Sequence, residues 1–218
     1  MSLAIFDLDN TLLSGDSDYL WGCFLVEQGV VDAEHYEREN QRFYDAYHDG
    51  SLNINEFLRF ALQPLAKNSL ETLQQWHRQF MQEKIEPLIT SKSRDLLQQH
   101  REKGDYLLII TATNRFVTAP IAQHLGVDAL LATDPEIQNG QYTGEVEGIP
   151  CFQEGKIHRL QAWLKTNPHS LEGSYFYSDS HNDLPLLKQV DYPVVVDADE
   201  TLTAYAQQQG WPQISLKD

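Results

Sequence analysis

Two carboxylates stand directly after a short apolar run near the beginning of the chain. Asp7 and Asp9 lie in Asp7-Leu-Asp-Asn-Thr11, which follows the apolar residues 3–6. If that run is a buried strand, both carboxylates lie at its carboxyl end, where open α/β sheets bind ligands. Side chains alternate along a strand, so both can face one site only where the strand ends. Taken alone, the pattern is explained as well by a loop or a helix cap as by a functional site.

Groups that could hold an anion follow later apolar runs. Thr111 follows the run 106–110 and precedes Ala112 and a predicted helix. A hydroxyl and free backbone N–H groups should therefore lie at the same edge of the sheet as Asp7 and Asp9. Lys156 stands at a predicted helix start in Gly155-Lys-Ile-His158. The ordinary alternatives are helix capping for Thr111 and a solvated surface position for Lys156.

Two further carboxylates, Asp179 and Asp183, follow the run 175–177. Four carboxylates at one sheet edge repel one another unless a hard cation offsets them, and Mg²⁺ takes a few carboxylates with waters and phosphate oxygens. A hydroxyl, backbone amides and a lysine beside that metal would hold a phosphoryl group. An aspartate could then attack phosphorus and split hydrolysis into two displacements. We expect Asp7 to be this nucleophile.

The elements that must position these residues are short strands alternating with helices. Apolar runs without alternation, typical of strands buried on both faces, occur at 3–6, 106–110, 129–132, 175–177 and 193–196. Helical stretches between them end before Gly104, Gly126 and Gly210. The order predicts an α/β fold with a three-layer, Rossmann-like parallel sheet as its core.

Residues 15–86 break this alternation, because about 70 residues carry apolar side chains at helical spacing and no convincing strand. Gly29 and Gly50 mark breaks, and the capping-box pattern Asn53-Ile-Asn-Glu56 predicts a helix from Ile54. We expect three or four helices here.

A second irregularity, at 136–147, places Asn139-Gly140 between alternating runs, which predicts a small β-hairpin. Nothing resembles a flexible linker, so the helical insertion is expected to be a cap on the sheet. The predicted division is a hydrolase core of residues 1–14 and 87–218 and a helical cap domain of residues 15–86.

Composition excludes several classes of function. The 218 residues contain 16 Lys and Arg against 32 Asp and Glu, a net charge of −16 that disfavours nucleic acid and anionic lipid as partners. Asp7 interrupts the first apolar run, so neither a signal peptide nor a membrane span is expected there. Two cysteines, Cys23 and Cys151, are too few for a disulfide framework. We expect a cytoplasmic protein with a small-molecule partner; the oligomeric state is left open.

In their order and at strand ends, these groups resemble the four motifs of the haloacid dehalogenase-like hydrolase superfamily. Residues 7–11 resemble the first motif, Thr111 the second, Lys156 the third and residues 178–183 the fourth. The helical insertion after the first motif resembles the cap of the phosphoserine phosphatase-like branch (subfamily IB). Its bacterial members include phosphoserine and histidinol-phosphate phosphatases.

The resemblance implies a role for each motif residue. Asp7 would attack phosphorus and bind Mg²⁺, and Asp9 would protonate the leaving oxygen, deprotonate the water and bind the metal through its carbonyl. Asp179 would complete the metal ligation, while Asp183 would orient a metal-bound water or Lys156. In addition, Thr111, Ala112 and Lys156 would hold phosphate oxygens, and Asn182 would lie near the metal or phosphate.

Asp16 stands where phosphoserine phosphatases place a glutamate that contacts the substrate amine; its alternative is the N-cap of the first cap helix. The chain has Thr111-Ala-Thr113 where those enzymes carry Ser-Gly-Gly, and Ser178-Asp-Ser180 where they carry Gly-Asp-Gly. We therefore expect histidinol phosphate as substrate, ahead of phosphoserine or another small phosphate ester. The cap arginines Arg38, Arg42 and Arg59 could receive a substrate carboxylate.

Two other functions share part of this chemistry. Phosphotransfer to another acceptor would begin with the same aspartyl-phosphate. A phosphoacceptor switch, with Asp7 phosphorylated as in a response-regulator receiver, also uses acidic residues, a Thr or Ser and a Lys around Mg²⁺. Receivers lack a long helical insertion and place these groups in a different order.

Overall fold

A seven-stranded sheet forms the centre of the computed structural model, which describes residues 2–218. The strand order is β4-β3-β2-β1-β5-β6-β7, and every pair is parallel except β3 with β4. The strands are β1 (Leu3–Phe6), β2 (Tyr106–Asn114), β3 (Ala129–Gln138), β4 (Gln141–Glu147), β5 (Tyr175–Ser178), β6 (Tyr192–Val196) and β7 (Gln213–Ile214).

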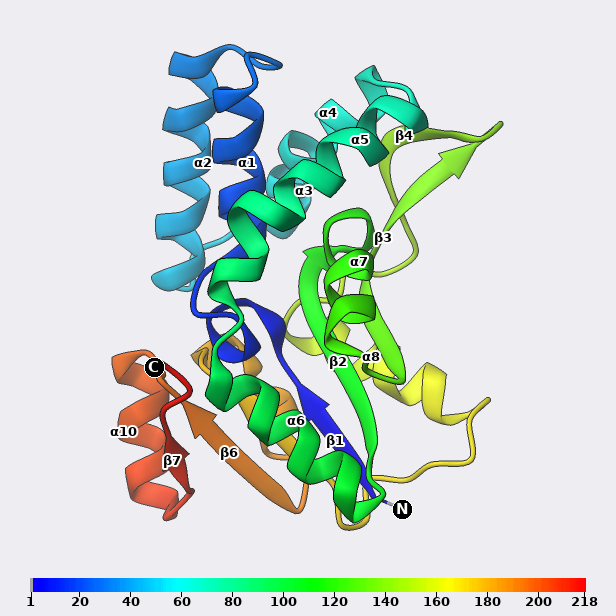
Figure 1. Ribbon diagram of the computed structural model, residues 1–218. Helices are drawn as coiled ribbons and strands as arrows, with labels where there is room; N and C mark the ends of the chain where they lie inside the picture. The colour runs from blue at the N-terminus through cyan, green and yellow to red at the C-terminus, as the bar shows by residue number, and fades with distance from the viewer. Residues whose placement is uncertain (1) are drawn as a thin grey trace.

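Helices cover both faces of this sheet (Figure 1). Along β1, Leu3 and Ile5 enter one apolar cluster and Ala4 and Phe6 the other, because successive side chains point to opposite faces. The first cluster contains side chains of α8 (Glu154–Leu164), α9 (Leu184–Leu187) and α10 (Glu200–Gln209). The second contains those of α6 (Ser91–Lys103) and α7 (Arg115–Leu125). The predicted three-layer α/β core is confirmed.

The helical insertion holds five helices where three or four were expected. They are α1 (Ser17–Glu27), α2 (Ala33–His48), α3 (Ile54–Ala61), α4 (Gln63–Lys67) and α5 (Leu70–Phe80). The extra break falls at Pro64, which is tolerated in the first turn of α4 but would interrupt a longer helix. The predicted start of α3 is confirmed, since the Asn53 side chain accepts hydrogen bonds from the backbone N–H groups of Asn55 and Glu56. We call these five helices the cap.

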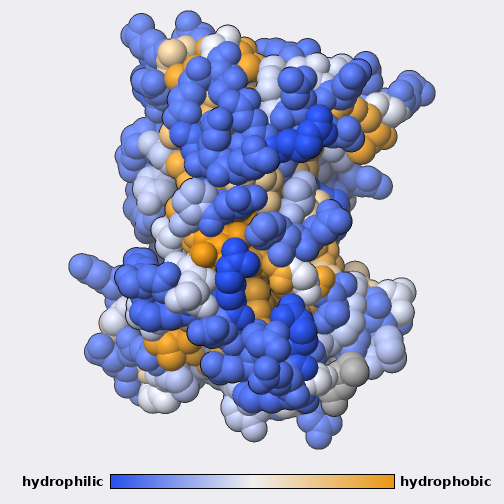
Figure 2. All heavy atoms as spheres, in the orientation of Figure 1, coloured by the Kyte–Doolittle hydropathy of each residue, from blue (hydrophilic) through white to orange (hydrophobic). Residues whose placement is uncertain are grey.

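Apolar packing joins the cap to the sheet at two places. Trp21, Phe24 and Phe80 enter the same cluster as core residues of α6 and α7. Farther out, Leu58, Leu62, Leu65 and Leu73 pack with Phe116 of α7 and with Tyr142 and Val146 of β4. On the face that Figure 2 shows, polar residues dominate and apolar side chains gather mainly at the waist between cap and sheet. The exact domain boundaries, 1–14 with 87–218 and 15–86, stay a prediction.

The hairpin is part of a longer strand. We expected a short strand at 129–132 and a separate hairpin, but β3 runs without interruption from one into the other. Asn139 and Gly140 form the turn with positive φ angles of 51° and 76°, as a tight hairpin turn requires. The short edge strand β7 was not predicted, because two residues carry no periodic signal. No helix within residues 2–218 is long and apolar enough to cross a membrane.

Candidate active site

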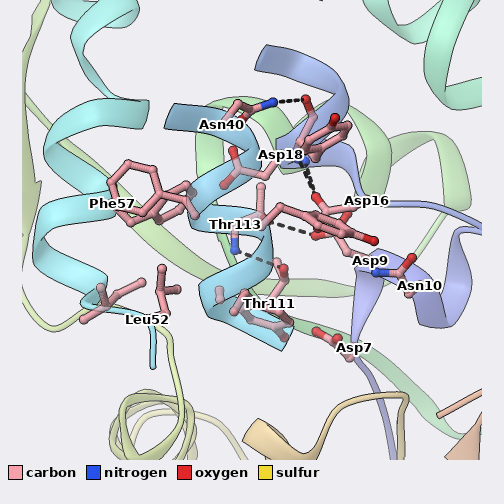
Figure 3. Close-up of a pocket in the computed structure, with 16 residues that line it drawn as sticks. Asp7, Asp9, Asn10, Asp16, Asp18, Asn40, Leu52, Phe57, Thr111 and Thr113 are labelled. Carbon is pink, nitrogen blue, oxygen red and sulfur yellow. Dashed lines mark hydrogen bonds between the residues drawn. The ribbon is translucent and has the colours of Figure 1, made fainter. Parts of the chain in front are cut away.

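The site lies where the carboxyl ends of β1, β2 and β5 meet under the cap, and its floor is a set of carboxylates. Asp7 follows β1 directly, and Asp9 and Asn10 interrupt the wide helical turn Leu8–Leu12 with non-helical backbone angles. Asn10 takes a left-handed conformation (φ 56°), which asparagine tolerates better than most residues. The kink allows Asp7 and Asp9 to line the same cavity (Figure 3), as the sequence predicted.

Lys156 joins two of the floor carboxylates. Its Nζ donates to Asp7 Oδ1 at 2.9 Å and to Asp183 Oδ2 at 2.8 Å, and Ser178 Oγ donates to the same Asp183 oxygen at 2.7 Å. All three charged residues are at most 3% exposed. Burial opposes the charged amine, but the two carboxylates raise the pKa of Lys156 above its usual value, so it stays protonated. Lys156 thus lies behind Asp7 as its counter-ion.

The floor holds more negative charge than this one lysine offsets. Burial, together with Asp183 and Asp9 and against the effect of Lys156, raises the pKa of Asp7 to about 7. Burial and the charges of Asp7 and Asp183 likewise raise the pKa of Asp179. The Asp179 carboxylate is fixed by Thr11, whose Oγ1 donates to Oδ1 at 2.9 Å. These carboxylates need a further cation in order to stay ionised together.

The donor set suits Mg²⁺. Within residues 2–218, no three His, Cys, Asp or Glu side chains form a closed metal cage. Mg²⁺ rarely uses such a cage; it takes one or two carboxylates and completes its shell with waters and phosphate oxygens. The carboxylates of Asp7 and Asp179 are available for this role above the pH at which they ionise. The residues present therefore fit a hard divalent cation.

Asp9 is held from two sides by groups of different elements. Its Oδ1 accepts from the backbone N–H of Ser17, the first residue of α1, at 2.6 Å, and its Oδ2 accepts from Thr113 Oγ1 at 2.9 Å. Burial and the nearby Asp16 raise the pKa of Asp9 to about 6, against the effect of these hydrogen bonds. A carboxyl group with a pKa near neutral can give and take a proton during one reaction cycle.

Sequence reasoning missed Thr113, although its spacing from Thr111 was a usable signal. Residues two apart on a strand share a face, and β2 continues to Asn114, so both threonines line the cavity beside Ala112. Thr111 Oγ1 accepts from the Thr113 backbone N–H at 3.2 Å, which leaves the Thr111 hydroxyl proton free to donate.

The cap supplies the other wall of the cavity. Asp16 is the N-cap of α1, and its Oδ1 accepts from the backbone N–H groups of Asp18 and Tyr19, both at 2.9 Å. It also lines the cavity, so the capping role and a substrate role are compatible. The remaining cap residues of the wall are Asp18, Tyr19, Asn40, Phe43, Tyr44, Tyr47, Leu52, Ile54 and Phe57.

Asn182 lies between the floor and the cap. Its Nδ2 donates to the backbone carbonyl of Tyr47 in α2 at 3.1 Å, and its Oδ1 accepts from Gln153 Nε2 at 2.8 Å. The neighbouring His181 lies close enough to the turn after α2 that a Cβ added to Gly50 would be 3.0 Å from His181 Nε2. The loop after β5 therefore contacts the C-terminal end of α2, and the sequence did not predict this contact.

A parallel sheet whose acidic strand ends lie under a helical cap defines a class of hydrolases, and comparison with known proteins agrees. The family model described as haloacid dehalogenase-like hydrolase matches residues 4–188. The chain belongs to this family, as its motifs predicted.

Relatives narrow the class to phosphatases. A protein of Neisseria meningitidis named histidinol-phosphatase is 44% identical over 99% of both chains. A Mycobacterium tuberculosis protein named phosphoserine phosphatase is 29% identical over 95% of this chain and 68% of its own length. The predicted enzyme class, a phosphatase, is confirmed.

Solved structures agree on the fold. A Bordetella pertussis protein of unknown function superposes with a TM-score of 0.93 at 43% identity, with 99% of both chains covered. A substrate-bound phosphoserine phosphatase superposes with a TM-score of 0.72 over 100% of this chain and 93% of the other, at 19% identity. This second likeness concerns the fold alone.

Proposed function

We propose that the protein is a Mg²⁺-dependent phosphomonoesterase that works through a phosphorylated Asp7 and acts on a small amine-bearing phosphate ester. The observation that carries the proposal is the position of Asp7: its carboxylate lies on the cavity floor, fixed by the buried Lys156 and adjacent to Asp9. An ionised carboxylate so placed is a nucleophile with its proton-transfer partner beside it.

In the proposed reaction, an Asp7 carboxylate oxygen forms a bond to phosphorus as the bond from phosphorus to the ester oxygen breaks. Asp9, which Ser17 and Thr113 hold in position, gives its proton to that leaving oxygen. The ionised Asp9 then takes a proton from water, whose oxygen attacks phosphorus and releases Asp7. Thr111 and the backbone of Ala112 hold non-bridging oxygens throughout.

Mg²⁺, held by the carboxylates of Asp7 and Asp179 and the carbonyl of Asp9, would offset the charges of the nucleophile and the phosphoryl group. Lys156 keeps Asp7 ionised and oriented, and Asp183 keeps Lys156 in place. Without the charge of Lys156, the pKa of Asp7 would be higher and Asp7 would favour its neutral, non-nucleophilic form.

Histidinol phosphate is the substrate that we propose, with phosphoserine as the alternative. The name of the Neisseria relative supports the first, and Asp16 on the cavity wall supports an amine on the substrate. A cytoplasmic location belongs to the same proposal, because the chain contains only two cysteines, as is usual in a reducing compartment.

The test is phosphate release from histidinol phosphate, phosphoserine, phosphoethanolamine and sugar phosphates, with Mg²⁺ or EDTA, by wild type and Asp7→Asn. We expect Mg²⁺-dependent turnover that the variant loses by about 10³-fold or more, since it lacks the attacking oxygen. Wild-type activity that survives in Asp7→Asn would refute the proposed nucleophile. Labelling of Asp7 by a phosphodonor without any phosphate release would point to the switch or to phosphotransfer instead.

A further inference from the structure

The cap wall contains a carboxylate that the proposed reaction does not use. Asp18 lies in the first turn of α1 and lines the cavity, and Figure 3 shows its side chain extending from α1 across the cavity towards the side where Phe57 lies. Within residues 2–218, no hydrogen bond or ion pair to its carboxyl oxygens is found; only its backbone N–H is engaged, with Asp16. Every other carboxylate of the cavity has at least one donor.

The cavity wall around Asp18 offers no positive side chain within residues 2–218. Among the described residues, none of the side chains lining the cavity is a lysine, arginine or histidine. Of the arginines Arg38, Arg42 and Arg59, two are engaged elsewhere: Arg42 pairs with Glu39 and Glu56, and Arg38 contacts Glu39. Arg59 lines grooves on other faces of the cap. The sequence-based option that one of them receives a substrate carboxylate finds no support in this arrangement.

Apart from Asn40, whose Nδ2 donates to the backbone carbonyl of Tyr19, the rest of the wall is apolar and aromatic. Phe43, Tyr44, Tyr47 and Phe57 line it together with Leu52 and Ile54. Aromatic faces attract cations and stack on flat rings, and they offer nothing to an anion. A guest that fits both features has a cationic amine for the carboxylates and a flat or apolar body for the aromatic side.

We propose that Asp18 is a specificity-determining residue: together with Asp16 it binds the ammonium of the substrate and rejects esters that carry a carboxylate. The inference rests on the proposed function and deepens it, because it restricts the substrate to amine-bearing phosphate monoesters without a carboxylate. A carboxylate placed beside Asp16 and Asp18 would be a buried charge with no partner, which is strongly unfavourable. An ammonium in the same place receives charge-assisted hydrogen bonds.

The electrostatics of the cavity wall agree with this role. Burial and the charges of Asp16 and Asp9 raise the pKa of Asp18 well above its usual value. The wall therefore gains most from a guest that brings a positive charge.

Phosphoethanolamine and phosphoserine differ only in the carboxylate, so the ratio of their kcat/KM values measures the rejection directly. We expect wild type to prefer phosphoethanolamine, and Asp18→Asn to reduce the ratio by about tenfold, because one charge leaves the wall while its shape stays. Asp18→Glu should keep the ratio closer to that of wild type. Glu37→Gln removes one charge from an exposed position on α2 and should change the ratio by less than about twofold, since solvent screens it.

Each outcome separates the inference from the proposed function. A ratio that Asp18→Asn leaves unchanged, or a wild type that prefers phosphoserine, overturns the inference while the phosphatase proposal stands. Turnover of p-nitrophenyl phosphate but of no amine-bearing ester would overturn both the inference and the amine-bearing substrate, leaving the nucleophile Asp7 intact. If Asp18→Asn does not fold, Asp18→Ser carries the same measurement with a residue that is favourable at a helix start.

Discussion

The floor and the cap wall of one cavity are built on opposite principles. On the floor, Asp7, Asp9 and Asp179 each accept a hydrogen bond from a buried or partly buried donor, and the lysine behind them is 2% exposed. On the wall, Asp18 has no donor among the described residues and stands among aromatic side chains. The protein itself orients the carboxylates of the floor, whereas in our proposal the substrate supplies the partner of Asp18.

The difference teaches where chemistry and selectivity reside. Reacting groups gain from preorganisation, because groups that are already oriented need no rearrangement in the transition state. A wall that selects a substrate instead contains groups without a partner, because only a ligand that supplies the partner is bound well. The strand ends fix the first set, and the inserted helices carry the second.

The largest effect is expected from Lys156→Met, which removes the counter-ion of the floor. Two buried carboxylates would lose their partner, so we expect a loss of about 3–5 kcal/mol in the free energy of unfolding and of nearly all activity. Urea unfolding and phosphate release measure both. Lys165→Met, at the exposed C-terminal end of the same helix, is the control and should behave like wild type. A stable, active Lys156→Met enzyme would show that the floor carboxylates do not depend on this counter-ion, and the contrast with the wall would be wrong.

A smaller effect is expected from Mg²⁺ and pH. The pKa of Asp7 is raised from 3.8 to about 7 and that of Asp9 from 3.8 to about 6. At a pH between the ordinary and the raised values, the folded protein therefore binds more protons than the unfolded chain. Without Mg²⁺, stability should therefore fall as pH rises from about 4 to about 7. Mg²⁺ at 100 times its Kd should add about 2.7 kcal/mol at pH 8, where the floor is ionised, and much less at pH 5.

Thermal unfolding with Mg²⁺ or EDTA at the two pH values checks this expectation. Asp179→Asn should reduce the stabilisation by Mg²⁺ at pH 8, since it removes one of the two carboxylate ligands proposed for the metal. Equal stabilisation at both pH values would show that the metal binds away from the floor carboxylates.

The smallest effect is expected at the contact between the turn after α2 and the loop after β5. Gly50→Ala and Gly29→Ala both place a Cβ at a left-handed residue, with φ of 78° and 66°, and should each cost about 1 kcal/mol of stability. Only at Gly50 does the new Cβ meet a neighbour, His181 Nε2 at 3.0 Å. We expect Gly50→Ala alone to change kcat/KM, by several-fold, through a shifted α2. Equal kinetics in the two variants would mean that this contact does not position the wall.

Much of the floor could be predicted from the sequence because its residues follow buried strands. An unalternated apolar run identifies a parallel strand, and in a parallel sheet the residues after each run gather at one edge. Asp7, Thr111 and Asp179 were found in this way without knowledge of strand order. Thr113 was missed because the apolar run ended before β2 did.

The wall could be predicted only in outline. The helical spacing of apolar residues predicted a cap, but the same residue types serve its core and its cavity side: Phe43 lines the cavity while Phe24 is buried in the cluster shared with the sheet. Which face of each helix meets the cavity depends on how the helices pack on one another and on the hairpin, and the five-helix count depended on Pro64.

The sequence by itself determined which chemical groups follow the strands, since acidic residues at strand ends and a lysine at a helix start need only local patterns and the geometry of parallel sheets. The tertiary structure alone decided that Lys156 pairs with Asp7 and Asp183 and that Asn182 donates to the end of α2. It also decided that, among the described residues, no cationic side chain lines the cavity beside Asp18. These facts join residues far apart in the chain. Tertiary packing brings such pairs together, and a local sequence pattern cannot predict them.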